Sequence, residues 1–215
     1  MNNHVIICKA SSQHIEYAEK ICELVYISAQ ERGTGIAKRN PEYIKKKMTD
    51  GKAIIALDGK HLAGFSYIET WGHQEFVANS GLIVAHEYRN SGLARQIKCK
   101  VFELSRERFP KAKIFSITTG TAVMKINYEL GFRPVPFTEL TEDKDFWDGC
   151  KGCRNYDILE RNNHKMCLCT ALLYDPFYKR PEIEVPPPSR IAESMRPRIE
   201  GWRSMVAGLR LIVTG

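Results

Sequence analysis

The sequence lacks any apolar run long enough to span a membrane, so no transmembrane helix is expected. Its first residues, Met-Asn-Asn-His, do not resemble a secretory signal peptide. The seven cysteines are odd in number and come with no export signal. They therefore argue against a disulfide framework and for reduced thiols or a metal site. We expect a soluble cytoplasmic protein.

Two common phosphate-binding signatures are also missing: the Gly-Lys-Ser/Thr of a Walker loop and the three-glycine G-x-G-x-x-G of dinucleotide-binding folds. The formal charge is +7, but no basic stripe with interleaved aromatic residues is present. Nucleic acid is therefore not an expected partner, whereas a mild positive field suits an anionic cofactor or an acidic substrate. The 215 residues, 43% of them hydrophobic, suffice for one α/β domain and an appendage.

The most informative stretch that is present covers residues 81–94, Gly-Leu-Ile-Val-Ala-His-Glu-Tyr-Arg-Asn-Ser-Gly-Leu-Ala. An apolar strand runs into a polar turn, and a helix with an apolar stripe follows at once. Such a turn leaves backbone N–H groups of the helix start unpaired and aimed at one point, which suits a phosphate or pyrophosphate. Gly92 lets the backbone approach the ligand closely.

The turn from Arg89 to Ala94 reads Arg-x-x-Gly-x-Ala, which resembles the acyl-CoA pyrophosphate loop of the GNAT N-acetyltransferase superfamily. The lead-in, with Val84, His86 and Tyr88, is similar to that family's pattern before the loop. Residues 120–132 are similar to a second family signature and end in the matching Leu-Gly-Phe. The resemblance covers residues 5–137, with one more strand near Cys167–Tyr174.

Hydrophobic periodicity and turn signals predict an element order that is also the order of that family. The expected strands are Val5–Lys9, Gly51–Leu57, His61–Trp71, Phe76–Ala85, Ile114–Thr118 and Phe132–Phe137, and the expected helices are Ser12–Ala29, Pro41–Thr49, Leu93–Phe109 and Thr121–Leu130. The resemblance implies an α/β GNAT fold, with a central mixed, splayed sheet and helices on both faces. Residues 1–178 would form the domain, with a cysteine-containing insertion at 138–169, and residues 179–215 a tail containing proline and arginine.

The resemblance further implies an acyl-CoA-dependent N-acyltransferase, with acetyl-CoA or another acyl-CoA as co-substrate. The pantetheine arm would lie between the strands Phe76–Ala85 and Ile114–Thr118. The residues expected to contact the cofactor are Leu82, Ile83, Val84, Arg89, Asn90, Ser91, Gly92, Leu93, Ala94 and Asn127. The backbone of Leu82–Val84 could also supply an N–H donor to the developing oxyanion.

The sequence departs from the family pattern at the position that usually supplies the general acid for the leaving thiolate. Asn127 stands in the place of the usual tyrosine, and Tyr128 is rotated by about 100° on the same helix. Asn127 is either a solvated helix residue or a hydrogen-bond donor to the thiolate sulfur or the cofactor amide. The candidate catalytic residues are thus Asn127 and Tyr128 with Glu69 or Glu75 as the base, His73 and His86 being alternatives.

The acceptor site is expected near the loop that joins the first two helices, which carries Arg32, Lys38 and Arg39. Arginine grips carboxylates well, so these cations suggest an acidic acceptor. Asn79 and Ser80 are further candidates that could hold a relay water, unless they face a helix. The segments 32–39 and 78–84 and the cysteine segment described below resemble short bacterial GNAT-type N-acylglutamate synthases. That resemblance implies the α-amino group of glutamate as acceptor, in arginine biosynthesis, and acetyl-CoA or succinyl-CoA as donor.

Four cysteines form two close pairs, Cys150-x-x-Cys153 and Cys167-x-Cys169, separated by thirteen residues. They could complete a structural zinc site of four thiolates. The alternatives are reduced thiols that pack as small apolar groups and a redox pair at Cys150 and Cys153. The tail at 179–215 could dock on the domain or mediate self-association into a homodimer.

Two other function classes remain open on the sequence. The missing tyrosine and the unclear base fit a non-catalytic CoA-binding module that acts as a sensor. The charge and the cysteines fit a zinc-containing nucleic-acid-binding protein, although the absence of a basic stripe counts against it.

Overall fold

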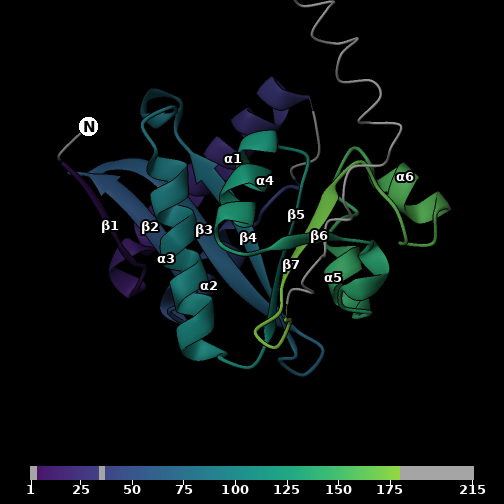
Figure 1. Cartoon of the computed structure of the whole chain (residues 1–215). Coiled ribbons are helices and arrows are strands. Elements are labelled where there is room, and N and C mark those ends of the chain that lie inside the picture. The colour runs from purple at the N-terminus through teal and green to yellow at the C-terminus, as the bar shows by residue number, and fades with distance from the viewer. Residues whose placement is uncertain (1–3, 34–36, 180–215) are drawn as a thin grey trace, which may run out of the picture. The chain divides into compact units, whose positions relative to one another are not determined.

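The computed structural model describes residues 4–33 and 37–179, apart from the side chain of Arg32. A seven-stranded sheet runs through this part of the chain in the order β1-β2-β3-β4-β5-β7-β6 (Figure 1). Its neighbours are antiparallel except for β4 and β5, which are parallel. The strands are β1 Val5–Lys9, β2 Ala53–Asp58, β3 His61–Trp71, β4 Phe76–Val84, β5 Lys113–Thr118, β6 Arg133–Val135 and β7 Thr170–Tyr174. The predicted α/β fold with a mixed sheet is confirmed.

Helices cover both faces of the sheet. They are α1 Ala18–Arg32, α2 Pro41–Thr49, α3 Leu93–Arg108, α4 Thr121–Glu129, α5 Lys144–Asp148 and α6 Tyr156–Arg161. The apolar stripe of α3, with Ile97 and Val101, packs on one face against Ile54 and Val77. On the other face, α1 and α2 pack against residues of β2 and β3 such as Phe65, and α5 and α6 pack over the β5–β7–β6 side. The alternation of side chains along each strand supplies both cores.

The sheet opens between β4 and β5. Their pairing covers Phe76–Ala78 of β4 and ends at the pair Ala78–Phe115, although β4 continues to Val84. Beyond this point no described residue of β5 pairs with β4, so one edge of β4 carries unpaired backbone groups. The predicted splay of these two strands is thus present in the structure.

A bulge bends β4 just beyond the opening. Phe65 of β3 pairs with Ile83 and Tyr67 pairs with Ser80, so one residue of β3 faces two residues of β4. Gly81 lies in the bulge with φ +64°, in the left-handed region that favours glycine. The bulge turns the backbone of Gly81 and Leu82 out of the regular ladder at the edge of the opening.

Three local predictions need correction. The first helical segment begins as a 3₁₀ helix over Ser12–Tyr17, where His14 and Ser11 form a capping box, before α1 continues to Arg32. The strand expected at Phe132–Phe137 is only the three residues of β6, because Pro136 and a 3₁₀ turn follow it. Strand β7 begins at Thr170, so the cysteines of the Cys-x-Cys pair precede it instead of lying on it.

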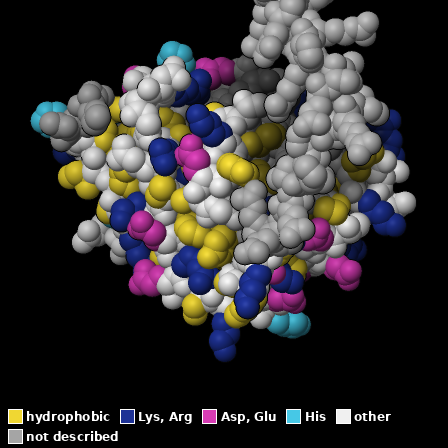
Figure 2. Space-filling model, viewed as in Figure 1, with side chains coloured by type: hydrophobic (Ala, Val, Ile, Leu, Met, Phe, Trp, Pro, Cys, Tyr) yellow, Lys and Arg dark blue, Asp and Glu magenta, His cyan; other side chains and the backbone are white. Residues whose placement is uncertain are grey.

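The helices and the surface bear on two partners that the sequence analysis does not expect, a membrane and a nucleic acid. None of the helices in the described segments is long and apolar enough to cross a membrane. On the face shown in Figure 2, the Lys and Arg side chains are interspersed with Asp and Glu and do not gather in one stripe. This face therefore lacks the concentrated basic footprint of a nucleic-acid-binding protein. The tail beyond residue 179 lies outside the described residues.

Candidate functional site

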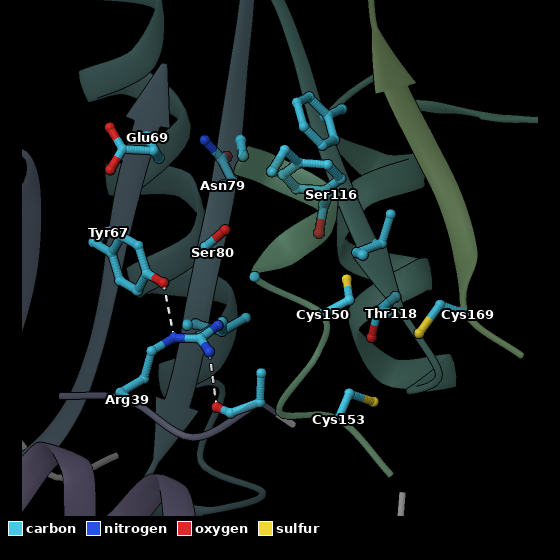
Figure 3. A pocket seen from close by; sticks show the side chains of 18 of the residues that line it. Arg39, Tyr67, Glu69, Asn79, Ser80, Ser116, Thr118, Cys150, Cys153 and Cys169 are labelled. Carbon is cyan, nitrogen blue, oxygen red and sulfur yellow. Dashed lines mark hydrogen bonds between the residues drawn. The ribbon is translucent and has the colours of Figure 1, made fainter. Parts of the chain in front are cut away.

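A cavity of about 500 Å³ lies where β4 and β5 separate (Figure 3). One wall comes from residues 37–40 before α2 and from Tyr67 on β3, and the opposite wall from β5, α5, α6 and the cysteine segment. The residues Asn79–Ile83 of β4 line it as well. Elements far apart in the sequence therefore enclose one pocket at the opening of the sheet, which is the usual place for a ligand in such folds.

Arg39 reaches into this pocket from the segment before α2. Its Nε donates to the hydroxyl of Tyr67 at 2.8 Å, and one Nη donates to the carbonyls of Ala37 at 2.8 Å and Lys38 at 3.2 Å. These bonds fix the guanidinium, and its other Nη makes no hydrogen bond to a described residue. A positioned guanidinium with a free N–H group can bind a carboxylate.

The other two cations predicted for the acceptor differ from Arg39. The side chain of Lys38 is exposed, although its residue borders the pocket. Arg32 ends α1, and its side chain lies outside the described residues. A polar group that the sequence did not reveal is Asn155, which is buried in the pocket wall and whose Nδ2 makes no hydrogen bond within the described structure. Arg39 and Asn155 are thus two described donors in the cavity wall that remain available to an acceptor.

Glu69, the first candidate base, is held by several partners. Its carboxylate accepts hydrogen bonds from the hydroxyl of Tyr43 at 3.0 Å and from Lys47, and Lys52 lies 3.6 Å away. Burial, the largest single effect, would raise the pKa of the Glu69 carboxyl, but the hydrogen bond and charge of Lys47 outweigh it together with hydrogen bonds from the Thr70 amide and Tyr43, and the pKa lies below its ordinary value. Burial also raises the pKa of Tyr43, with further contributions from Tyr67 and Glu69. Glu69 therefore borders the pocket as a carboxylate of low proton affinity.

The remaining candidate bases lie away from the pocket. Glu75 is exposed and sits 3.5 Å from Lys113 at the hairpin between β3 and β4. His73 is exposed in the same hairpin, with φ +53°. His86 is exposed in the 3₁₀ turn His86–Tyr88 that follows β4. The structure brings none of these three side chains to the cavity wall.

Asn79 and Ser80 point to opposite faces of β4. Ser80 pairs with Tyr67 and lies on the pocket side, where it is labelled in Figure 3. Asn79 faces α3, and its Nδ2 donates to Ser105 Oγ at 2.8 Å. The helix-facing alternative therefore holds for Asn79, whereas Ser80 stays a candidate for contact with the acceptor or a water molecule.

Lys98 is a pocket residue that the sequence analysis missed. It lies on α3, is 1% exposed and donates from Nζ to Asn79 Oδ1 at 3.1 Å. None of the ion pairs among the described residues involves it, and burial lowers the pKa of its amine to about 7. The signal in the sequence was its place in the stripe of α3, four residues after Ala94 and three before Val101.

The turn after β4 has the form expected of an anion site. Gly92 precedes α3 with φ +84°, and a Cβ built there would meet no atom within 4 Å. The amides of Gly92, Leu93 and Ala94 donate no hydrogen bond to other described residues, while the next two amides close onto Gly92 O. Leu93 itself packs into the core, whereas Asn90 and Ser91 are exposed. The predicted orphan amides are thus present at the start of a sixteen-residue helix.

The side chain of Arg89 is engaged in hydrogen bonds within the protein. Its guanidinium donates to Glu31 at 2.8 Å, to Ser28 at 3.1 Å and to the carbonyl of Val84 at 3.3 Å. These bonds tie the turn to α1 and to the end of β4. Any contribution of Arg89 to anion binding would therefore come from its backbone.

Helix α4 buries one of the two candidate acid residues and exposes the other. Asn127 is fully buried, and neither atom of its amide has a hydrogen-bond partner within the described structure. Tyr128 is 62% exposed and lies outside the cavity wall. Tyr128 is therefore poorly placed for the acid role, and Asn127 is not the solvated helix residue that was one of its two interpretations.

Cys150, Cys153 and Cys169 lie across the cavity from Arg39 (Figure 3), and Cys167 also lines the cavity. Among residues 4–33 and 37–179, no group of three or more His, Cys, Asp or Glu side chains is arranged to hold a metal ion. Cys150, Cys167 and Cys169 instead pack against the apolar cluster under α5 and α6. Burial raises the pKa of Cys150 to about 11 and that of Cys169 to about 12. These observations favour the packing interpretation over the zinc site.

No protein-family model matches the sequence, and the search of curated proteins found no relative. Among solved structures, the N-acetylglutamate synthase of Neisseria gonorrhoeae with coenzyme A and N-acetyl-glutamate matches with a TM-score of 0.58 and 17% identity, over 83% of this chain and 36% of its own. Rv2747 of Mycobacterium tuberculosis, in complex with CoA, matches with a TM-score of 0.57 and 13% identity, over 79% of this chain and 98% of its own.

Diaminobutyrate acetyltransferase EctA of Paenibacillus lautus, in complex with L-2,4-diaminobutyric acid and coenzyme A, matches with a TM-score of 0.53 and 11% identity, over 82% of this chain and 98% of its own. The chain spans little more than a third of the length of the synthase, 36%, but nearly all of the other two. At these identities the likeness concerns architecture. The protein has an α/β GNAT-like fold, with a seven-stranded mixed sheet and flanking helices.

Proposed function

We propose that the protein is an acyl-CoA-dependent N-acyltransferase that acts on a small primary amine. The observation that carries the proposal is the opening between β4 and β5. It begins after the pair Ala78–Phe115, and residues of both strands line the cavity there. The strand β4 leads from this opening to the turn at Gly92, where orphan amides begin a long helix. A pyrophosphate at the turn and an extended arm along the unpaired edge of β4 fit this arrangement.

The residues present fit coenzyme A. The backbone from Arg89 to Ala94 would hold the pyrophosphate, and the open space at Gly92 leaves room for phosphate oxygens. The backbone of Leu82 to Val84 would pair with the amide groups of the pantetheine arm. When bound, the acyl-CoA supplies a thioester carbonyl that an amine can attack.

The acceptor would lie against the wall that carries Arg39. Its free Nη and the unpartnered Nδ2 of Asn155 are donors that suit the carboxylate of an amino acid. Two of the proteins with a similar fold were solved with N-acetyl-glutamate and with L-2,4-diaminobutyric acid. We therefore extend the proposal to the α-amino group of glutamate or a similar acidic amino acid, in arginine biosynthesis.

The chemistry needs an oxyanion donor and a route for the proton of the amine. The bulge at Gly81 and Leu82 turns backbone groups toward the opening, where an N–H could stabilise the oxyanion. The lowered pKa of Glu69 makes its carboxylate a weak base, so a water held near Ser80 would serve as a relay that carries the proton of the amine away from the site.

The test is an assay of thiol release with acetyl-CoA or succinyl-CoA and a panel of amino acids. We expect turnover with glutamate above that with glutamine, because glutamine lacks the second carboxylate. Turnover with lysine or alanine but not with glutamate would support the acyltransferase activity and contradict the proposal of an acidic acceptor. If calorimetry shows that CoA binds but no amine is turned over, the enzyme proposal is wrong and a non-catalytic CoA-binding module is favoured.

A further inference from the structure

Lys98 is a buried amine with few partners. An ammonium group has three N–H donors, and Asn79 Oδ1 satisfies one of them at 3.1 Å. The ring of Phe132 lies 5.1 Å from Nζ and offers the cation a π face, but no carboxylate among the described residues pairs with Lys98. A buried amine with one neutral hydrogen-bond partner is costly to the fold, so its position calls for a functional reason.

The partners of Lys98 also fix the direction of its hydrogen bond. Ser105 Oγ donates to the carbonyl of Val101 at 2.8 Å and therefore accepts from Asn79 Nδ2. That bond turns the other end of the amide, Oδ1, toward Lys98. Asn79 thus presents an acceptor to Nζ and is a positioning residue for the amine.

The place of Lys98 relative to the opening indicates its role. The last pair of β4 and β5 is Ala78–Phe115, and Asn79 is the next residue of β4. Lys98 lies on the α3 side of the sheet and lines the cavity through the opening, whereas Arg39 lies on the α1 and α2 side. An acceptor held by Arg39 would approach the thioester from one face, and Lys98 would meet the sulfur from the other.

We propose that Lys98 is the acid that protonates the leaving thiolate, a role for which the buried Asn127 has no proton to give and the exposed Tyr128 is misplaced. This inference rests on the proposed function. The amine nitrogen attacks the acyl carbon and a C–N bond forms. The C–S bond then breaks, its electron pair goes to sulfur, and Nζ transfers a proton to that sulfur. Lys98 regains a proton from the acceptor nitrogen through water.

The acidity of Lys98 suits this transfer. Burial lowers the pKa of the amine to about 7, and an unperturbed thiol has a pKa of about 8.5. The two pKa values are therefore close enough for a proton to pass from nitrogen to sulfur. Asn79 and Phe132 face Nζ from β4 and from the segment after α4, and neither carries a charge, so desolvation alone sets the shift.

The first test compares Lys98→Met with Lys100→Met, which changes an exposed lysine of the same helix. We expect Lys98→Met to lower kcat about 100-fold or more, since acid–base groups contribute that much, with little change in acyl-CoA affinity. Removal of a buried amine should raise the melting temperature, which separates loss of chemistry from loss of fold. Lys100→Met should behave as the wild type. An unchanged kcat in Lys98→Met would overturn the proposal.

The pH profile distinguishes an acid from a base. An acid must be protonated, so kcat of the wild type should fall as pH rises through the pKa of Lys98, and Lys98→Met should lose this alkaline limb. Asn79→Asp places a carboxylate beside Nζ, which raises the pKa of the amine and should move the limb to higher pH. A limb that stays in place in Asn79→Asp, or a Lys98-dependent loss of activity at low pH instead, contradicts the acid role.

Bound CoA gives a readout without turnover. A protonated Nζ and a thiolate beside it stabilise each other's charge, so ultraviolet titration should show a lower thiol pKa for CoA bound to the wild type than for CoA bound to Lys98→Met. Equal thiol pKa values would place Lys98 away from the sulfur. Failure of the wild type to bind CoA at all would instead overturn the proposed function.

Discussion

Gly81 lies so close to the ring of Tyr67 that a Cβ built on it would come within 2.5 Å of Cε1. The same ring carries the hydroxyl that accepts from Arg39 Nε. The bulge of β4 and the positioned guanidinium are therefore mechanically linked through one aromatic side chain. A glycine at 81 is required both by its φ of +64° and by this contact.

Gly81→Ala should disturb the acceptor wall through Tyr67. The added methyl must displace the ring, and such overpacking costs about 1–3 kcal/mol of stability beyond the backbone strain. The displaced hydroxyl would release Arg39, so the KM of the acceptor should rise more than that of the acyl-CoA. Chemical denaturation and steady-state kinetics measure the two effects.

Gly59→Ala is the matched control for this change. Gly59 has nearly the same φ, +59°, in the turn between β2 and β3, but its Cβ would meet no atom within 4 Å. It should show only the strain of a left-handed alanine, about 1–2 kcal/mol, with unchanged kinetic constants. Equal effects of the two substitutions would show that the contact with Tyr67 is unimportant.

Gly92→Trp should remove CoA affinity while the fold survives. The space in front of Gly92 is open, so the indole can be placed without a clash with the core, but it would fill the position assigned to the pyrophosphate. Loss of even one charge-assisted hydrogen bond should weaken binding about tenfold or more. Calorimetry with CoA checks this, with Gly59→Trp as the control for a bulky residue at positive φ. Full CoA affinity in Gly92→Trp would place the cofactor elsewhere.

Arg39→Met should act on the acceptor and spare the donor. Hydrogen bonds to charged groups are worth about 1.5–3 kcal/mol, so the KM of a carboxylate acceptor should rise about 10- to 100-fold. Lys38→Met is the control, because Lys38 is the neighbouring cation and its side chain is exposed. A KM that rises equally in both variants would indicate a general field effect instead of a specific grip. An unchanged KM in Arg39→Met would remove Arg39 from the acceptor site.

The sequence predicted the architecture because its strongest signals are local. The hairpin at Asp58-Gly59, the stripe of α3 and the Leu-Gly-Phe at the end of α4 each fix one element, and together they order the sheet. The short helices α5 and α6 were missed because five or six residues carry too little periodicity to distinguish a helix from a loop. Their place over the β5–β7–β6 side depends on tertiary contacts.

The sequence predicted the part of the site that depends on backbone conformation, but not the parts that depend on tertiary packing. The pattern around Gly92 predicted an anion-binding turn, because a strand followed by a glycine and the start of a helix leaves backbone amides without hydrogen-bond partners. Lys98 has a place in the apolar stripe of α3 as its only signal, and that signal is weak because a lysine in a helix is usually exposed; its burial follows from the packing of α3 on the sheet. The weakness of Glu69 as a base likewise follows from Lys47 and Tyr43, which reach this residue of β3 from helix α2.

The cysteine wall yields the last prediction. If Cys150 and its neighbours pack as thiols, purified reduced protein should contain less than one zinc per chain, and a chelator should leave the melting temperature unchanged. Cys150→Ala and Cys169→Ala should then each cost about 1 kcal/mol, as ordinary packing changes do. Cys99→Ala on α3, outside the cluster, should give a similar value. A structural zinc would make both cluster variants far more costly than Cys99→Ala, because metal binding of that kind contributes about 10 kcal/mol to folding.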